Sequence, residues 1–399
     1  MLSRRHVLSL LAAAPFTPAL TACAPGDLPD PIAAWRDPGA GEADPRRYAL
    51  AHAILAPNPH NRQPWLVDLI GENELVLSAD LERLLPATDP LDRQIVLGCG
   101  AFLELFDLAC RANNRRAEIT LWPEGEPQPR LDQRPIAHIR LFEEPTRKDD
   151  LFDQILNRRT NREAFEDRAI ADETMSEAAR QALWPWAPPD VGATADGSPS
   201  TTPAPSPFRI EWTRTPDALA ALRTLAWNGF DRECRTPAAY QESVDLMRVG
   251  RAEIARNRDG IALEGPMIEF AKATGLLTRE SLADLDNRFT RDGIEAWRPL
   301  AESAPTYAWL ISRDNTRATQ IEAGRAYARF NLAATAAGLA MHPWSQALQE
   351  YPEIADLYAE ARRLTGTQDG ETLQMLVRAG YGPTIGPAPR RGLREHLRA

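Results

Sequence analysis

The segment from Pro57 to Trp65 limits the fold of this chain most, because it cannot form a regular helix. Two prolines at a spacing of two, Pro57 and Pro59, fix their own φ angles and restrict the preceding residues, which keeps the backbone extended. Four polar side chains crowd into the same segment, those of Asn58, His60, Asn61 and Gln63. We expect a rigid polar loop that leads into a strand over residues 65–70 and suits a planar heteroaromatic ligand. The alternative is a polar connection that only caps and turns the chain.

Apolar periodicity predicts an α+β fold, because segments of strand and of helix patterning both occur along the chain. Strands are expected over residues 65–70, 74–78, 117–122, 136–142, 208–212, 306–312 and 372–379. Helices are expected over residues 95–112, 151–156, 175–184, 217–257 and 318–339. Glycine and proline interrupt residues 258–303, where we expect a mobile cover over a site. A Pro/Ser/Thr-rich tract over residues 188–207 indicates a surface loop.

The charge balance argues against a nucleic-acid partner and makes arginine the source of any anion site. The 399 residues carry a formal net charge of −10, whereas nucleic-acid binding needs a basic surface. The chain holds two lysines, Lys148 and Lys272, among its 46 basic residues. Any site for an anion must therefore be built from arginine.

The cysteines do not indicate a disulfide framework. Cys99 and Cys110 lie on one face of a predicted helix, and their separation of eleven residues corresponds to about 16 Å of rise. A disulfide needs Cα atoms within about 7 Å, so these two cannot pair with each other. Cys234 can pair with at most one of them. No Cys/His spacing resembles a metal site.

The N-terminus has the pattern of an export signal. Arg4 and Arg5 precede an apolar run that ends near Leu20 and is shorter than the roughly 20 residues of a spanning helix. Residues 20–23 resemble a bacterial lipobox, which predicts a lipid on Cys23; the alternatives are simple cleavage or retention of the segment. We expect a twin-arginine signal over 1–23, a linker over 24–46, contact with the twin-arginine export machinery, and a periplasmic or cell-envelope location with possible membrane attachment through Cys23.

A second motif occupies residues 158–165, Arg-Arg-Thr-Asn-Arg-Glu-Ala-Phe. It resembles the Arg-Arg-Ser-x-Arg-x-Phe signature of the nitroreductase superfamily. The first motif resembles the FMN-binding loop of the same superfamily, and six of its positions match: Ala56, Pro57, Asn61, Gln63, Pro64 and Trp65. The two motifs together identify the chain as similar to this superfamily over nearly the whole length that follows the signal.

The resemblance implies FMN as cofactor and no catalytic side chain, because the flavin carries the redox chemistry. In the superfamily pattern, Arg158 and Thr160 fall beside the FMN phosphate, and Arg162 beside the pyrimidine edge. The remaining FMN-binding candidates are Asn58, His60, Asn61, Gln63, Arg159, Ser345, Gln346, Arg390 and Arg391. The alternative for Arg158 and Arg159 is a solvated helix end, and for Arg390 and Arg391 a frayed basic tail. His342 is expected to be hydrogen-bonded and not to act as a base.

The two motifs are complementary, since residues 47–145 hold only the loop and residues 150–399 only the arginine signature. This distribution resembles the fused, Acg-like branch of the superfamily. The resemblance implies a nitroreductase-like fold in which two halves of one chain form an internal pseudodimer. We expect one intact flavin site and a monomer.

Three hypotheses for function follow. The first is an FMN-dependent oxidoreductase that reduces a small-molecule electron acceptor, such as a nitro compound or quinone, with an unidentified electron donor. The second is an FMN-sequestering or storage protein without turnover. The third is an unrelated exported structural lipoprotein whose motif matches are accidental.

Overall fold

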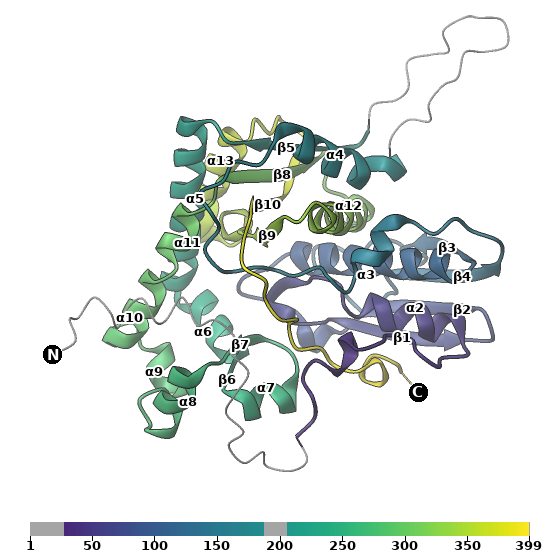
Figure 1. Ribbon diagram of the computed structural model, residues 1–399, viewed down its shortest axis with the longest axis horizontal. Helices are drawn as coiled ribbons and strands as arrows, with labels where there is room; N and C mark the ends of the chain where they lie inside the picture. The colour runs from purple at the N-terminus through teal and green to yellow at the C-terminus, as the bar shows by residue number, and fades with distance from the viewer. Residues whose placement is uncertain (1–27, 187–205, 399) are drawn as a thin grey trace, which may run out of the picture.

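The computed structural model describes residues 28–186 and 206–398, and it contains two four-stranded antiparallel sheets with helices between and around them (Figure 1). The first sheet has the order β1-β2-β4-β3, with bounds Trp65–Ile70, Glu74–Ala79, Ala137–Glu143 and Arg115–Leu121. The second has the order β5-β8-β10-β9, with bounds Phe208–Thr213, Thr306–Ser312, Thr372–Gly380 and Ala340–Pro343. The α+β class is confirmed. Each predicted half supplies one sheet, while the internal pseudodimer stays a prediction.

The two central strands of the second sheet are buried on both faces, which explains why β8 reads as an apolar run, whereas β10 also buries Gln374 and Arg378. Every residue of both strands is buried. Met375 and Val377 belong to a core shared with α12 (Arg317–Ala336). Leu373 and Leu376 face a second core that contains residues of α5 (Pro216–Arg235) and α13 (Ala355–Leu364).

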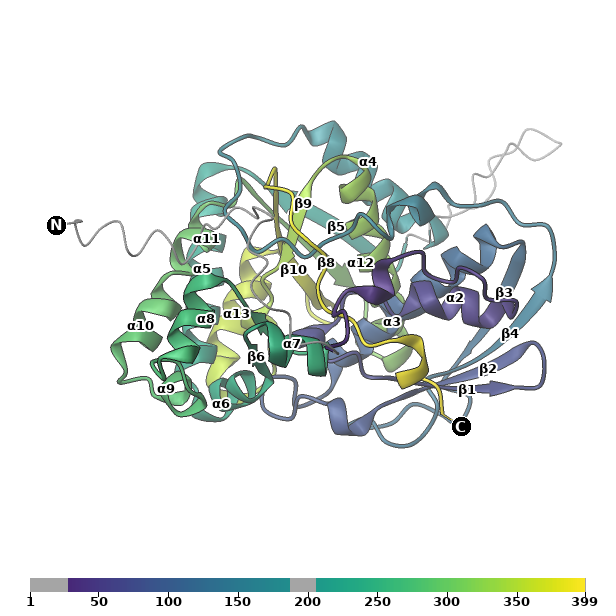
Figure 2. The same cartoon turned by 60° about the horizontal axis from the view of Figure 1, so that its bottom comes forward.

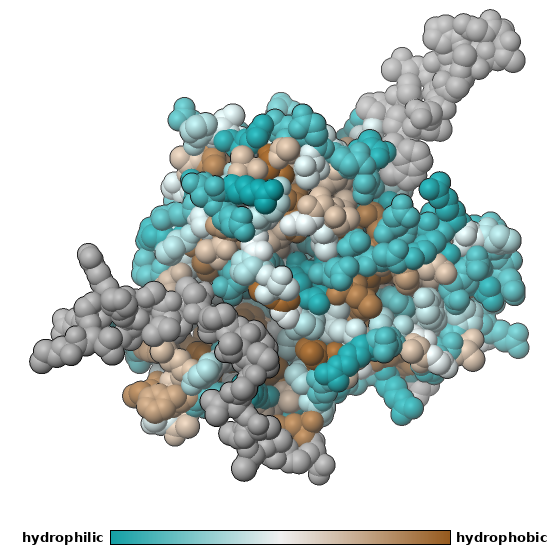
Figure 3. All heavy atoms as spheres, in the orientation of Figure 1, coloured by the Kyte–Doolittle hydropathy of each residue, from teal (hydrophilic) through white to brown (hydrophobic). Residues whose placement is uncertain are grey.

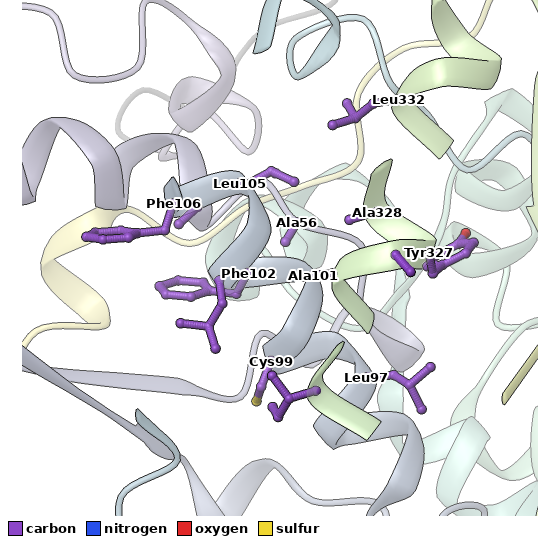
Figure 4. Packing of buried hydrophobic residues seen from close by; sticks show 14 of the residues in the cluster. Ala56, Leu97, Cys99, Ala101, Phe102, Leu105, Phe106, Tyr327, Ala328 and Leu332 are labelled. Carbon is purple, nitrogen blue, oxygen red and sulfur yellow. The ribbon is translucent and has the colours of Figure 1, made fainter. Parts of the chain in front are cut away.

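Helices α3 (Arg93–Ala112) and α12 cross at close range and join the two halves (Figure 4). A Cβ atom on Gly100 would lie 2.0 Å from the carbonyl oxygen of Ile321, and one on Gly324 would lie 2.1 Å from that of Leu97. Only glycine permits this approach at either position. Figure 4 shows Ala101 of α3 near Tyr327 and Ala328 of α12 in the shared core.

The C-terminal tail leaves the second sheet and ends on the first (Figure 1). Val67 of β1 donates its backbone N–H to the carbonyl of His396 at 2.8 Å, and Arg398 donates to the carbonyl of Val67 at 2.9 Å. Leu397 forms a parallel bridge with Val67. The tail therefore carries Arg390 and Arg391 from one half toward the other.

Residues 247–302 form an outlying region of short elements, of which Figure 2 shows residues 251–257 near the tail and residues 266–302 farther from it. They include a small parallel sheet and five short helices, with bounds Met247–Val249 (β6), Arg251–Asn257 (α7), Ile261–Leu263 (β7), Pro266–Ala273 (α8), Arg279–Ala283 (α9), Arg288–Glu295 (α10) and Arg298–Glu302 (α11). Much of this region packs on α6 (Pro237–Leu246) through a separate apolar cluster. Its role as a mobile cover stays a prediction.

Four expectations need correction. Residues 31–46 are not a tether, because a 3-10 helix over Ala33–Trp35 buries Trp35 and α2 begins at Pro45 (Pro45–Ala53). The predicted helix over 151–156 is a 3-10 helix, Asp150–Gln154, whereas α4 (Asp172–Leu183) forms close to its predicted place. The helical run over 217–257 is interrupted by β6, where the chain pairs with β7. No strand is expected directly after the predicted helix over 318–339, whereas Ala340–Pro343 forms β9, paired with β10.

Several sequence features concern membranes, metals and thiols. Cys23, the export signal and most of the tract over 188–207 lie outside the described residues. Cys99, Cys110 and Cys234 are buried free thiols. No helix within residues 28–186 and 206–398 has the length and apolar character needed to cross a bilayer. The same residues hold no His/Cys/Asp/Glu group arranged to bind a metal.

On the face drawn in Figure 3, hydrophilic side chains predominate over the first sheet and its helices.

Candidate functional site

The Pro57–Trp65 loop is not extended throughout, as the two prolines led us to expect, because Pro59–Asn61 forms a 3-10 turn and the backbone around it is tight and irregular. His60, Asn61 and Gln63 have φ angles of 45°, 51° and 51°, in the left-handed region that non-glycine residues seldom adopt. The loop holds this conformation through its own side chains, since Gln63 donates its backbone N–H to Asn58 Oδ1 at 2.7 Å. Three left-handed residues within four positions mark a backbone that its surroundings over-determine, as functional loops often are.

Gln63 and Asn61 connect this loop to two distant parts of the chain. Gln63 is completely buried; its Nε2 donates to the carbonyl of Arg258 at 2.9 Å, and its Oε1 accepts the N–H of Arg391 at 2.9 Å. Asn61 Nδ2 donates to the carbonyl of Pro389 at 3.0 Å, and its Oδ1 accepts from Arg390. The loop therefore fixes the tail in place and also contacts the outlying region.

Two predicted arginines converge where the chain leaves α2. Arg158 Nη2 donates to the carbonyl of Leu55 at 3.3 Å, and Arg390 Nη2 donates to that of Ala56 at 3.1 Å. The side chains of Arg158 and Arg390 come from positions 232 residues apart and are almost completely buried. Both alternatives from the sequence, a solvated helix end and a frayed tail, are therefore excluded for these two residues.

Arg159 completes a group that we call the arginine cluster: Arg158, Arg159 and Arg390. Trp35 lies against it, with its ring centroid 4.9 Å from the guanidinium carbon of Arg159 and 5.5 Å from that of Arg390. Trp35 is the site residue that the sequence did not indicate, because it lies in a segment without periodicity. A lone tryptophan among Pro, Gly and Asp residues was the available signal.

The arginine cluster lacks a negative counterpart among the described residues, where none of its members forms an ion pair. Burial lowers the pKa of Arg158 to about 10, and burial together with the neighbouring arginines lowers that of Arg390 to about 9. Four N–H groups are buried without an acceptor: Arg158 Nε and Nη1, Arg159 Nε and Arg390 Nε. Buried charges are normally paired, so this donor set fits a bound anion with several acceptor oxygens.

Arg162 lies at the open side of this region. Its side chain is exposed, and its charge contributes to lowering the pKa values of His60, His342, Arg378 and Arg390. Burial, Arg162 and Arg62 lower the pKa of His60 to about 4, and its Nδ1 has no partner in the described structure. The positive charge of Arg162 therefore acts on Arg390 of the arginine cluster and on one histidine from each half, His60 and His342.

His342 is hydrogen-bonded, as expected. Its Nδ1 accepts from Arg378 Nε at 3.1 Å, so the neutral ring carries its proton on Nε2. Burial, Arg378 and Arg162 hold the pKa of His342 well below its usual value. The ring therefore stays neutral and cannot accept a proton at Nδ1 while that contact persists.

The structure does not bring every candidate residue to the arginine cluster. Arg391 Nη2 donates to the carbonyl of Glu395 at 2.7 Å and its Nε pairs with the Glu395 carboxylate at 3.4 Å, so this guanidinium is engaged within the tail. Ser345 Oγ donates to the carbonyl of Leu376 at 3.0 Å, and Gln346 Oε1 is buried without a partner among the described residues. Thr160 is half-buried, next to Arg159. Of the two tail arginines, only Arg390 joins the cluster.

A separate hollow of about 410 Å³ lies between α5 and α11. It is lined by Arg223, Trp227 and Arg298 among others, and it shares no residue with the arginine cluster. Arg298 is already paired with Glu295 at 3.0 Å, and Arg223 donates to the carbonyl of Ala304. Its arginines therefore have partners, in contrast to the arginine cluster.

Residues 155–381, which are more than half of the chain, match the Nitroreductase family. Two similar curated proteins come from Mycobacterium tuberculosis. An uncharacterized protein is 32% identical over 126 residues, which are 30% of this chain and 35% of the relative. A protein named "Putative NAD(P)H nitroreductase acg" is 36% identical over 77 residues, 19% of this chain and 23% of the relative. The matches thus span about a third or less of these relatives' length.

Solved structures with partial similarity include one nitroreductase and one nitroreductase-like protein. The FMN-dependent nitroreductase NfnB from Mycobacterium smegmatis, in complex with NADPH, is 20% identical, with a TM-score of 0.35, 62% of this chain covered and 96% of that chain. A nitroreductase-like family protein from Bacillus cereus is 15% identical, with a TM-score of 0.33 and coverages of 64% and 97%.

Proposed function

This chain belongs to the nitroreductase family, and from that premise we propose that it is an FMN-dependent oxidoreductase that reduces a small acceptor of the nitro or quinone class. FMN, when bound, supplies the transfer of a hydride or of two electrons, so the protein needs to bind, orient and shield it. The observation that carries the proposal is the arginine cluster, which is buried without an ion pair among the described residues.

The arginine cluster suits the phosphate of FMN. A phosphate monoester carries close to two negative charges and offers three strong acceptor oxygens, and arginine donates to such oxygens in a forked arrangement. The four unpartnered N–H groups of Arg158, Arg159 and Arg390 are the donors that this assignment uses. Asn61 and the carbonyl of Ala56 hold Arg390 in place for it.

Arg162 is assigned to the pyrimidine edge of the flavin, where its positive charge stabilises negative charge that develops on reduction. Its exposed side chain beside two neutral histidines supports this role. Because His60 and His342 stay neutral at physiological pH, Arg162 is the fixed charge in that part of the site. The Pro57–Trp65 loop lines the same region through His60 and Asn61.

The two halves act as an internal pseudodimer in this proposal, with the loop contributed by residues 47–145 and the arginine signature by residues 150–399. The helix pair α3 and α12 joins the halves, and the tail passes from one to the other, which supports a single site within one chain. The protein is then a monomer with one FMN. Cofactor stoichiometry and molecular mass test this part of the proposal.

We also propose export by the twin-arginine route, with a lipid on Cys23 and a location in the cell envelope. The paired arginines before a short apolar run and the Leu20–Cys23 sequence support it. The M. smegmatis structure contains NADPH and the acg relative is named an NAD(P)H nitroreductase. An envelope location implies a different electron donor for this chain, because reduced nicotinamide cofactors are scarce there.

The second candidate function is FMN sequestration without turnover. In that case the outlying region over residues 247–302 would shield the bound FMN. One experiment separates the two candidates. The purified flavoprotein is reduced with dithionite under anaerobic conditions and then mixed with a nitroaromatic compound or a quinone. Rapid, concentration-dependent reoxidation supports the oxidoreductase, whereas indifference to every acceptor supports sequestration.

The site assignment has its own test. The double variant Arg158→Ala/Arg162→Ala is expected to fold but to purify without flavin, because no lysine in the described site can replace either charge. Arg116→Ala is the matched control, since Arg116 is a partly exposed arginine of β3 that pairs with Glu144. Full FMN occupancy in the double variant would show that the assignment is wrong.

A further inference from the structure

The segment Pro31–Arg36 packs against the arginine cluster, although it precedes the first half in the sequence. Trp35 Nε1 donates to the carbonyl of Ala388 at 2.8 Å, and the carbonyl of Pro31 accepts the N–H of Arg390 at 2.9 Å. These two contacts bind the segment to the stretch of tail that carries Arg390. The indole is 8% exposed, so the contacts are formed away from bulk water.

The ring of Trp35 lies against two guanidinium groups that repel each other. Arg159 is among the charges that lower the pKa of Arg390, and no carboxylate among the described residues offsets that repulsion. The face of an indole is the aromatic surface that attracts a cation most strongly. With centroid distances of 4.9 Å and 5.5 Å, one ring attracts both charges at once.

The contact with the Trp35 ring does not occupy the arginine N–H groups that a ligand could use. A ring face accepts no conventional hydrogen bond, and Nε of Arg159 and Nε of Arg390 are both buried without a partner. A carboxylate in the same place would neutralise the arginines and occupy these donors. Trp35 holds the two side chains together while their donors remain available for an anion.

We propose that Trp35 is a positioning residue for the phosphate end of the flavin site, holding Arg159 and Arg390 toward one shared anion. This inference rests on the proposed function. It makes residues 31–36 a wall of the cofactor site. Trp35 should therefore contribute to binding of the phosphate and not to binding of the ring system of the ligand.

The test compares FMN with riboflavin, which has the same ring system but no phosphate. Dissociation constants of both ligands are measured by flavin fluorescence on the full chain after removal of bound flavin. Trp35→Leu is expected to weaken FMN binding about tenfold, which corresponds to about 1.4 kcal/mol, and to leave riboflavin binding within about twofold. Trp35→Phe retains an aromatic face and should restore most of the FMN affinity.

Trp186→Leu is the matched control. Trp186 also lies near an arginine, with its ring 6.0 Å from the guanidinium carbon of Arg325, and its indole N–H donates to Glu322 at 3.0 Å. The control should change neither dissociation constant. It reports what the loss of a half-buried tryptophan does to the fold in general.

The outcomes separate this inference from the proposed function. If the wild-type protein binds neither FMN nor riboflavin, the proposed function fails. If the wild-type protein binds FMN and Trp35→Leu binds it equally well, or loses FMN and riboflavin in equal proportion, the positioning role is overturned. Should Trp35→Leu not fold, Trp35→Phe decides: a loss of FMN affinity of about threefold with riboflavin unchanged supports the role, and an equal loss of both ligands contradicts it.

Discussion

Replacing Arg158 by methionine should make the flavin-free protein more stable, although it removes a large, almost completely buried side chain. Arg158 is 2% exposed and has no carboxylate partner among the described residues. Methionine has an unbranched apolar side chain that can fill most of the same space. Buried arginines that serve the fold behave in the opposite way, so the sign of the change is informative.

The expected change in the free energy of unfolding follows from the buried charge of Arg158 and from the single hydrogen bond that its side chain donates. Burial, with Arg159 contributing, lowers the pKa of Arg158 from 12.5 to about 10. Each pKa unit corresponds to 1.36 kcal/mol, so holding the charge in place costs about 3 kcal/mol. Removing the guanidinium leaves the carbonyl of Leu55 without its donor, at a cost of about 1 kcal/mol. Arg158→Met should therefore raise the free energy of unfolding by about 2 kcal/mol.

Arg93→Met is the matched control. Arg93 is completely buried like Arg158, but its Nε pairs with Glu350 at 3.2 Å and its Nη groups donate to the carbonyls of Gln374 and Leu348. Removing one partner of a buried pair leaves the other charge uncompensated, which typically costs about 3–5 kcal/mol. The same substitution is thus expected to have opposite signs at the two positions.

The assay is urea unfolding of the flavin-free proteins at pH 7, followed by circular dichroism. Adding FMN at about 100 times its dissociation constant should raise the free energy of unfolding of the wild-type protein by about 2.7 kcal/mol. The same FMN concentration should stabilise Arg158→Met much less. If Arg158→Met destabilises the protein as Arg93→Met does, Arg158 serves the fold and the reasoning from the unpaired charge is refuted.

Three further predictions concern acid groups, stoichiometry and the electron donor. Burial raises the pKa of Glu233 from 4.5 to about 7, so between these values the unfolded chain releases a proton that the folded chain keeps. Urea titrations at pH 5 and pH 8 should show that the free energy of unfolding falls by about 3 kcal/mol less in Glu233→Gln than in the wild-type protein, and Asp89, whose pKa burial also raises to about 7, contributes to the fall that remains. Flavin absorbance and light scattering should give one FMN per monomeric chain, whereas two flavins per chain would refute the single site. NADH and NADPH should reduce the bound flavin slowly while dithionite reduces it readily, and fast, saturable reduction by either nucleotide in a stopped-flow experiment would contradict the proposed envelope donor.

Much of the secondary structure could be predicted because burial leaves a regular pattern in the sequence. Strand Thr306–Ser312 is enclosed by helices on both faces and reads as an unbroken apolar run. The long helix of the first half reads as a 3.6-residue periodicity, and the structure begins it at Arg93, two residues before the predicted start. Strand Ala340–Pro343 was missed because it is four residues long and contains a histidine and a proline, which give no strand signal.

The site could be predicted only in part, because its members meet through tertiary contacts. The motif around Arg158 is local in sequence, so its resemblance to a family was visible without the structure. Which of Arg390 and Arg391 faces the cluster depends on Glu395 and Gln63, and nothing in a run of two arginines distinguishes them. Trp35 acts through residues more than 120 positions away, so no sequence window contains the contact.

The central claim is that the arginine cluster binds the phosphate of one FMN, and ³¹P NMR of the flavoprotein tests it most directly. The phosphate of a free monoester changes charge near pH 6. Held by Arg158, Arg159 and Arg390, the FMN phosphate should stay doubly charged, because opposite charges favour its ionised form. The account predicts one protein-bound resonance whose chemical shift does not change between about pH 5 and pH 8. A bound resonance that titrates near pH 6 like free FMN would contradict it.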